Sequence, residues 1–147
     1  MNKENVIIKM LALLKKNNIY ATPEFEKSLV KLVTTNIVKF VEVFYKDIRI
    51  ENIEEYNKHE KLKLTKKQKQ DLGGLDLYRY ECRINSNLKC IYIVINENNI
   101  RKTILLNAFN EDGDKTKGKN SYRDNINKSI GIYLNILQGG IKNGNWL

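Results

Sequence analysis

Three cationic side chains lie within one short stretch of the chain, residues 77–89. They are Arg79, Arg83 and Lys89. Cations of this kind attract a polyanion. These residue types favour contact with a polyanion backbone, such as that of RNA.

A small sheet is expected to position these side chains. Apolar residues alternate with polar ones over residues 76–84, 88–96 and 100–108, and turn residues separate the three runs. The pattern predicts a three-stranded antiparallel meander. Because neighbouring side chains of a strand point to opposite faces, we expect one face to carry mainly charged residues, namely Arg79, Glu81, Arg83 and Lys89. The other face is expected to carry Tyr80, Cys82, Cys90 and Tyr92.

Lysines flank the predicted sheet on both sides. The connector over residues 58–69 contains Lys61, Lys63, Lys66 and Lys67, and the loop over residues 110–120 contains Lys115, Lys117 and Lys119. They form either an ordinary solvated surface or an extension of a basic groove, and we treat them as candidate RNA contacts. The same loop holds an acidic cluster of Glu111, Asp112 and Asp114.

Helical spacing predicts the rest of the fold. Apolar residues predict a short helix over 5–16 and a long amphipathic helix over 23–46, with Thr22 as N-cap and Pro23 in the first turn. Residues 47–56 are ambiguous, and a helical turn is expected from Thr65. Ser121 and Asp124 resemble a capping box that starts a last helix, which Gly139 and the glycine after it would end.

These elements predict an α+β fold, in which N-terminal helices pack on a small, mainly antiparallel twisted sheet with a C-terminal helix. No linker or repeat divides the chain, so one domain over 1–147 is expected. Its parts are helices and basic connector (1–72), meander (73–109), and loop, helix and tail (110–147).

Charge and composition narrow the class of partner. The formal net charge is +9 and the pI is about 9.5, which favours a nucleic acid or an acidic protein as partner. No run approaches the roughly 18 apolar residues of a membrane span. Lys3, Glu4 and Lys9 interrupt the first apolar run, so an amphipathic helix is favoured over a signal peptide and a cytoplasmic location is expected.

The cysteines and the histidine predict no metal or cofactor site. His59 is the single histidine, and no Cys/His pair has metal-ligand spacing. If the first hairpin centres on Ser86, Cys82 and Cys90 face each other across it. A strained cross-strand disulfide is conceivable there, but two reduced, packed cysteines are the favoured interpretation in a cytosol.

Three short segments carry a resemblance to a known family. They read Tyr-Glu-Cys-Arg-Ile at 80–84, Leu-Lys-Cys-Ile-Tyr at 88–92 and Ile-Leu-Leu-Asn-Ala-Phe at 104–109. These segments resemble the RelE/ParE toxin superfamily, especially its HigB-like and phage-derived branches. The order of elements, which is helices, basic connector, meander, loop and last helix, resembles that superfamily as well. The resemblance covers about residues 77–137.

The resemblance implies a RelE-like fold and a function. It implies the toxin of a type II toxin-antitoxin system, a ribosome-dependent, metal-independent messenger-RNA endoribonuclease that a cognate antitoxin protein silences. By position, it implies catalytic roles for Arg79, Arg83, Lys89 and Tyr122.

The chain departs from that branch in ways that keep alternatives open. The residues after Phe109 are acidic, Lys89 replaces an arginine and so lacks a bidentate fork, and no histidine is expected near the sheet. A non-enzymatic inhibitor from a phage or mobile element is therefore a second interpretation. Such a protein would use a basic surface to bind a nucleic-acid machine or an acidic protein. A ParE-like gyrase inhibitor is a third.

Overall fold

A computed structural model describes residues 2–49, 59–111 and 115–140, and the side chains within these ranges except those of 115–121 and 140. Its elements, in chain order, are α1 (Lys3–Lys15), β1 (Ile19–Ala21), α2 (Pro23–Leu32), α3 (Ile37–Ile48), β2 (His59–Lys61), α4 (Lys66–Asp71), β3 (Leu77–Cys82), β4 (Asn85–Glu97), β5 (Ile100–Asn110) and α5 (Lys115–Asn135). A π-helical segment, Ile136–Gly140, follows α5.

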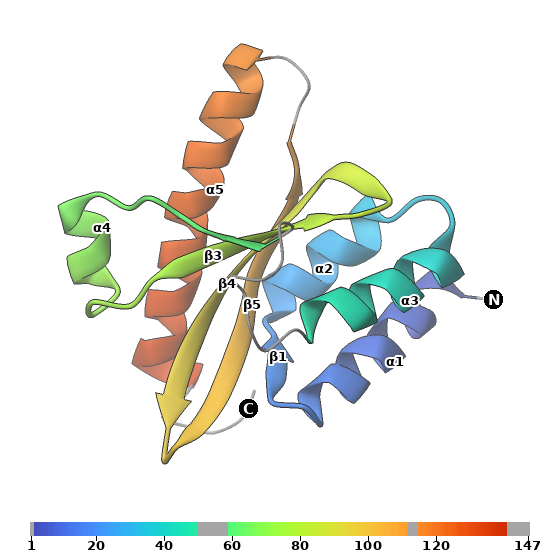
Figure 1. Ribbon diagram of the computed structural model, residues 1–147, viewed down its shortest axis with the longest axis horizontal. Coiled ribbons are helices and arrows are strands. Elements are labelled where there is room, and N and C mark those ends of the chain that lie inside the picture. Colours follow the sequence, from blue (N-terminus) through green and yellow to red (C-terminus); the bar gives the residue numbers. More distant parts are fainter. Residues whose placement is uncertain (1, 50–58, 112–114, 141–147) are drawn as a thin grey trace.

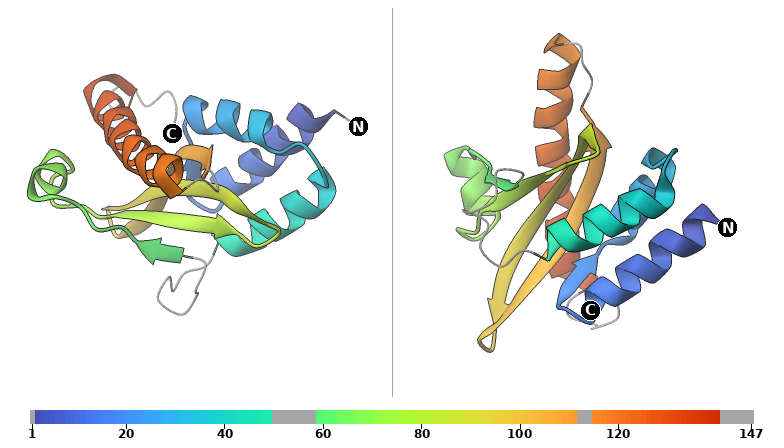
Figure 2. Two further views of the ribbon diagram at one scale, coloured as in Figure 1. Left: turned by 90° about the horizontal axis from the view of Figure 1, so that it is seen from above. Right: turned by 45° about the vertical axis from the view of Figure 1, so that its right-hand side comes forward.

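The predicted α+β fold and its meander are confirmed. The strands form one sheet in the order β1-β5-β4-β3-β2, in which β1 runs parallel to β5 and every other neighbouring pair is antiparallel. Figure 1 shows α1, α2 and α3 on one side of this sheet and α4 and α5 on the other. The two views in Figure 2 show the same division.

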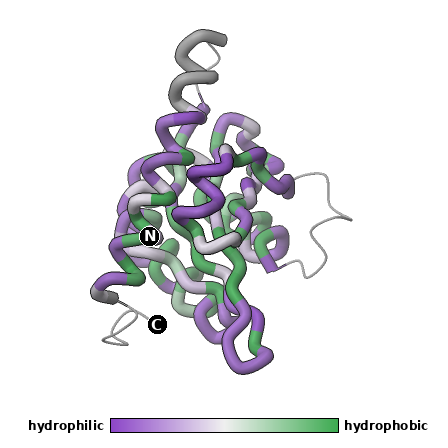
Figure 3. The backbone as a smooth tube through the Cα atoms, turned by 90° about the vertical axis from the view of Figure 1, so that its left-hand side faces the viewer, coloured by the Kyte–Doolittle hydropathy of each residue, from purple (hydrophilic) through white to green (hydrophobic). Residues whose placement is uncertain are grey.

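Two buried clusters reflect this division. The first joins α1–α3 to one face of the sheet and includes Phe25, Phe44, Tyr80, Cys90 and Leu105. The second joins α5, and Leu72 just after α4, to the other face and includes Leu77, Ile91, Ile104 and Ile130. Figure 3 shows the apolar residues running through the central strands, with polar residues along the outer parts of the helices. The central strands are therefore covered on both faces.

Sequence analysis missed the two edge strands. Each has three residues, too few for an alternation to stand out, and β2 has the polar sequence His-Glu-Lys. Pairing with a neighbouring strand defines both edge strands. Tyr20 of β1 aligns with Ile104 of β5, and Glu60 of β2 aligns with Arg79 of β3. An edge strand of this kind exists because a neighbouring strand offers hydrogen-bonding groups, which no local pattern predicts.

The single long helix predicted over residues 23–46 is wrong, because the chain forms two helices. Thr22 caps α2 as expected, but Val33 is extended (ψ 102°) and Asn36 is left-handed (φ 52°). Two adjacent threonines follow Val33, and such β-branched residues are weak helix formers. Asn accepts a left-handed conformation more readily than most residues. The break turns α3 back, so that Phe44 packs 6.3 Å from Phe25 between ring centroids.

The first hairpin turns earlier than expected. Its turn residues are Arg83 and Ile84, not a turn centred on Ser86, and the register shifts between Glu81 and Cys82. Cys90 therefore aligns with Tyr80 and Cys82 with Asn85, so the two cysteines are not directly opposite. Both thiols are free and buried, and burial raises the pKa of each. Reduced, packed cysteines are the state found.

Other predictions at helix ends have mixed outcomes. Thr65 begins α4 with a capping box completed by Gln68, as expected from a helical turn at that residue. By contrast, α5 begins at Lys115, so the predicted loop to residue 120 and the N-cap at Ser121 are wrong. The ambiguous segment 47–56 enters α3 up to Ile48, and residues 50–58 lie outside the described part of the chain. Among the described helices, none combines the length and apolar character needed to cross a membrane.

Candidate functional site

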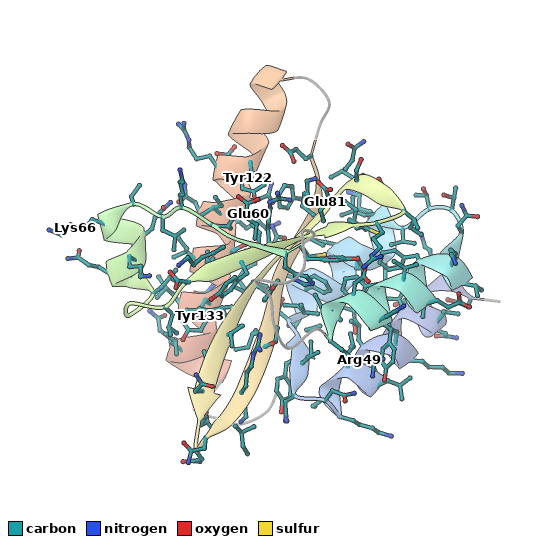
Figure 4. The ribbon with its side chains drawn as sticks, in the orientation of Figure 1. Arg49, Glu60, Lys66, Glu81, Tyr122 and Tyr133 are labelled. Carbon is teal, nitrogen blue, oxygen red and sulfur yellow. The ribbon has the colours of Figure 1, made fainter. Side chains whose placement is uncertain are left out.

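A hollow of about 450 Å³ opens on the α5 side of the sheet. Strands β2, β3 and β4, the residue after β5, and the helix α5 all contribute to it. Its lining residues are Glu60, Leu62, Lys63, Arg79, Glu81, Lys89, Glu111, Tyr122 and Ile126. Figure 4 shows the labelled Glu60, Glu81 and Tyr122 close together where α5 passes the strands. Three of the four predicted catalytic residues, Arg79, Lys89 and Tyr122, meet here.

Arg79 holds a carboxylate in its guanidinium fork. It lies directly opposite Glu60 in the β2–β3 register. Its Nε lies 3.1 Å from Glu60 Oε2, its Nη2 contacts the same oxygen, and its Nη1 lies 3.7 Å from Glu81 Oε1. Burial opposes the charge on Arg79, but the hydrogen bonds that it donates to Glu60 and the nearby negative charges outweigh this effect and raise the pKa of Arg79. Arg79 is a permanent cation beside the hollow.

Lys89 is held by groups around it. Its side chain is only 7% exposed, and its ammonium contacts Glu81 and donates to the Ser86 carbonyl oxygen. Glu111 Oε2 lies 3.6 Å from the same nitrogen. A buried ammonium needs such compensation, because it has left water. Lys89 therefore ties the β3–β4 hairpin to the end of β5 and has little donor capacity left for a ligand.

Tyr122 differs from Lys89 in its hydrogen bonding. Its ring packs edge-on against Phe109, with 5.7 Å between centroids, but its hydroxyl is buried without a hydrogen-bond partner among the described residues. Burial raises the pKa of Tyr122, although Arg79 acts in the other direction. The phenol keeps its proton at neutral pH and is a donor that lacks an acceptor. A buried polar group in this condition is uncommon.

Arg83 does not join this group, and the expected shared face with Arg79 is wrong. It lies in the turn after β3, where strand alternation has ended. Its Nε lies 3.0 Å from the carboxylate of Asp47, which belongs to α3 on the other side of the sheet. Tyr80 donates to the same carboxylate at 2.8 Å. Arg83 therefore belongs to a structural ion pair on the opposite face.

The predicted RNA-binding lysines are divided. Lys63 lines the hollow, and Lys66 and Lys67 are exposed on α4. Lys61 aligns with Tyr78, so it shares the face of Tyr78 and lies across the sheet from the hollow. The remaining lysines, at 115, 117 and 119, lie in the first turns of α5, and their side chains are outside the described part. Of the acidic cluster, Glu111 borders the hollow, whereas Asp112 and Asp114 lie outside the described part of the chain.

The expectation of no histidine near the sheet is wrong. His59 is part of β2, on the face opposite the hollow, where it is buried. Its Nδ1 lies 2.8 Å from the Tyr92 hydroxyl and its Nε2 lies 3.0 Å from the Asp47 carbonyl oxygen. The loss of water around the buried ring lowers the pKa of His59. Nothing in the local sequence links His59 to Tyr92, because the contact depends on the missed strand.

Glu60 is the lining residue that sequence analysis left without a role. It was visible as the single acid among the connector lysines, but only the β2–β3 pairing places it on Arg79. Across the described residues, no group of three His, Cys, Asp or Glu side chains could hold a metal ion.

Comparisons of the chain with protein-family models, with curated proteins and with solved structures found no match. The case for a function therefore depends on the hollow and on the charge of the chain.

Proposed function

We propose that this chain is a RelE-like toxin of a type II toxin-antitoxin system, a ribosome-dependent and metal-independent messenger-RNA endoribonuclease. One observation carries the proposal. Arg79, Lys89 and Tyr122 come from β3, β4 and α5, and they line one hollow together with three carboxylates. A cytoplasmic location, an RNA substrate on the ribosome and a cognate antitoxin belong to the same proposal.

The residues of the hollow match the needs of RNA cleavage by the 2′-hydroxyl. In that reaction the 2′-oxygen loses its proton and bonds to the adjacent phosphorus, and the 5′-oxygen leaves and gains a proton. The guanidinium of Arg79 stabilises the phosphorane. The protonated phenol of Tyr122 donates to the phosphate or to the leaving oxygen. These two residues supply the positive charge and the donor.

A carboxylate of the hollow accepts the 2′-hydroxyl proton. Glu81 is engaged by both Lys89 and Arg79, so its carboxylate is already occupied. Glu111 lies 3.6 Å from Lys89 rather than in close contact, and it borders the opening. We assign the base to Glu111, so the acid that follows Phe109 becomes part of the chemistry.

Induced expression in a bacterial host tests this function. Growth and transcript 5′-ends are followed together for wild type, Arg79→Ala and the control Arg83→Lys, which changes an arginine on the opposite face. Growth arrest with new in-frame transcript ends is expected for wild type and the control, and neither for Arg79→Ala. Normal growth with intact transcripts for wild type contradicts the proposal.

A second candidate is a non-enzymatic inhibitor that binds a nucleic-acid machine or an acidic protein. The hollow carries no excess of positive charge, because its three carboxylates (Glu60, Glu81 and Glu111) equal its three cations (Lys63, Arg79 and Lys89) in number. A hollow of this kind attracts RNA less strongly, which favours the binder. Such a binder would use the lysines outside the hollow. Its affinity would fall in small, similar steps as each lysine is replaced, and would fall steeply with added salt.

A further inference from the structure

Glu60 occupies Arg79 in the way that a phosphate would. Two nitrogens of one edge of the guanidinium, Nε and Nη2, converge on one oxygen of Glu60. Phosphate oxygens are preferred partners of the same fork. The anion that Arg79 binds in this structure is therefore a carboxylate of its own chain.

Among the ion pairs of the hollow, this one is the most accessible to exchange. The side chain of Glu60 is 59% exposed and that of Arg79 is 22% exposed, whereas Lys89 is almost enclosed. Ion pairs open to water contribute little to stability, because water solvates the separated charges. Glu60 can leave Arg79 at low cost, whereas Lys89 cannot exchange Glu81 without exposing a buried charge.

The backbone of Glu60 does not have to move for this exchange. Its neighbour His59 is anchored on the other face by Tyr92 and by the Asp47 carbonyl oxygen. Glu60 itself is held in register with Arg79. Rotation of the Glu60 side chain toward solvent is enough to open the fork, and β2 then returns the carboxylate when the ligand leaves.

The unpartnered hydroxyl of Tyr122 supplies an independent indication of a ligand. It borders the same hollow as Arg79 and is near enough to influence its charge, and it is a buried donor with no acceptor among the described residues. A phosphate oxygen in the fork of Arg79 would provide that acceptor. The carboxylate of Glu60 makes no hydrogen bond to this hydroxyl.

We infer that Arg79 and Tyr122 form the subsite for one phosphodiester of single-stranded RNA, and that Glu60 is an internal competitor which occupies Arg79 until that phosphate displaces it. The inference deepens the proposed function, and rests on it for the choice of RNA. Glu60 is thus a specificity-determining residue: it screens out weak anions and admits a phosphate that engages Arg79 and Tyr122 together.

Binding of an uncleavable strand tests the subsite without requiring catalysis. The probe is a fluorescein-labelled oligodeoxynucleotide of ten thymidines, which has no 2′-hydroxyl. Its affinity is measured by fluorescence anisotropy at fixed salt for wild type, Glu60→Gln, Glu60→Gln/Arg79→Gln and Tyr122→Phe. The matched control is Glu97→Gln, which removes one negative charge from an ion pair with Lys102 that is not part of the hollow.

The Glu60→Gln variant is expected to bind about three- to tenfold more tightly than wild type, as suits the loss of an exposed competitor. The double variant is expected to lose this gain, and Tyr122→Phe to bind more weakly than wild type. An unchanged affinity for Glu60→Gln overturns the inference. An equal gain for Glu97→Gln, or a gain that survives loss of Arg79, also overturns it, because net charge then explains the effect.

A labelled peptide of ten glutamates separates phosphate from carboxylate ligands. Loss of the competitor should raise the affinity of either ligand, so the discriminating variant is Tyr122→Phe, which should weaken binding of the oligodeoxynucleotide and leave binding of the peptide unchanged. An equal loss with both ligands overturns the phosphodiester assignment. The outcome is distinct from failure of the proposed function: a Glu60 effect on the oligodeoxynucleotide without transcript cleavage in cells supports the subsite and contradicts the ribonuclease.

Discussion

The two faces of the central sheet use polar side chains in different ways. On the face under α1–α3, Asp47 is buried but accepts hydrogen bonds from Tyr80 and Arg83, and His59 contacts both Tyr92 and the Asp47 backbone. On the face toward α5, Arg79 is held by an exposed carboxylate, and the buried hydroxyl of Tyr122 has no hydrogen-bond partner within the described ranges.

The difference indicates which face serves stability and which serves a ligand. Polar groups that satisfy one another lock the elements that they join, because breaking any one leaves the others unpaired in a buried site. Polar groups that are paired weakly, or left unpaired, keep free energy available for a ligand. The substitutions below test this contrast through the free energy of unfolding.

The largest effect is expected for Phe44→Ala. Phe44 has no solvent exposure, and its ring centroid lies 5.4 Å from that of Phe40 and 5.7 Å from that of Tyr80. Truncation leaves a cavity under the sheet and should lower the free energy of unfolding by about 3–5 kcal/mol in urea denaturation. Val38→Ala changes an exposed residue of the same helix and should have an effect below about 0.5 kcal/mol. Similar values for the two variants would contradict the core position of Phe44.

The next effect is expected for Asp47→Ala. The carboxylate of Asp47 is 1% exposed, and its removal leaves the Tyr80 hydroxyl without that acceptor, at a cost of about 2–3 kcal/mol. Glu97→Gln is the control, because it breaks an exposed pair with Lys102 and should cost about 0.5 kcal/mol or less. Equal losses in urea denaturation would show that the network under α3 contributes no more than surface charge does.

A smaller, pH-dependent effect is expected from His59. Burial lowers the pKa of His59 below its ordinary value of 6.5, so the unfolded chain binds this proton first as pH falls. The contribution of His59 to the free energy of unfolding should be fully present above pH 6.5. It should decline as pH falls below 6.5, and it should stop changing once pH is below the folded-state pKa. Groups near the ring include the Tyr92 hydroxyl, the Tyr80 ring, the Asp47 carbonyl oxygen and the charges of Asp47 and Arg101.

Urea denaturation of wild type and His59→Gln between pH 7.5 and 5 measures this dependence. The variant lacks the titrating ring, so its stability should change less over the same range. A parallel decline in both proteins would assign the acid sensitivity to other groups.

The smallest effect on stability is expected for Tyr122→Phe. The change removes a buried hydroxyl that no described residue hydrogen-bonds, so the free energy of unfolding should stay within about 1 kcal/mol of wild type or rise. The matched variant Tyr80→Phe removes a hydroxyl that donates to Asp47 and should lose about 1–2 kcal/mol. A larger loss for Tyr122→Phe than for Tyr80→Phe would reverse the proposed division between the two faces.

Local pattern was sufficient for much of the fold. The alternation over residues 77–110 predicted the meander, and Thr22 and Thr65 marked helix starts because the hydroxyl of each accepts from the backbone N–H three residues ahead. The face that carries Tyr80 and Cys90 was also predicted correctly. These features depend on residues that are near in sequence, so composition and spacing determine them.

The candidate site was only partly predictable for the same reason. Arg79 and Lys89 were placed on one face by alternation, but Arg83 left that face because the hairpin turns one residue after Cys82. Glu60 reached Arg79, and His59 reached Tyr92, only through pairing of β2 with β3. By itself, the sequence determined the charge, the meander and the residue types available for chemistry. Tertiary structure decided which charges neutralise one another and which donor stays unpaired, because strand pairing brings together residues 19 to 33 positions apart.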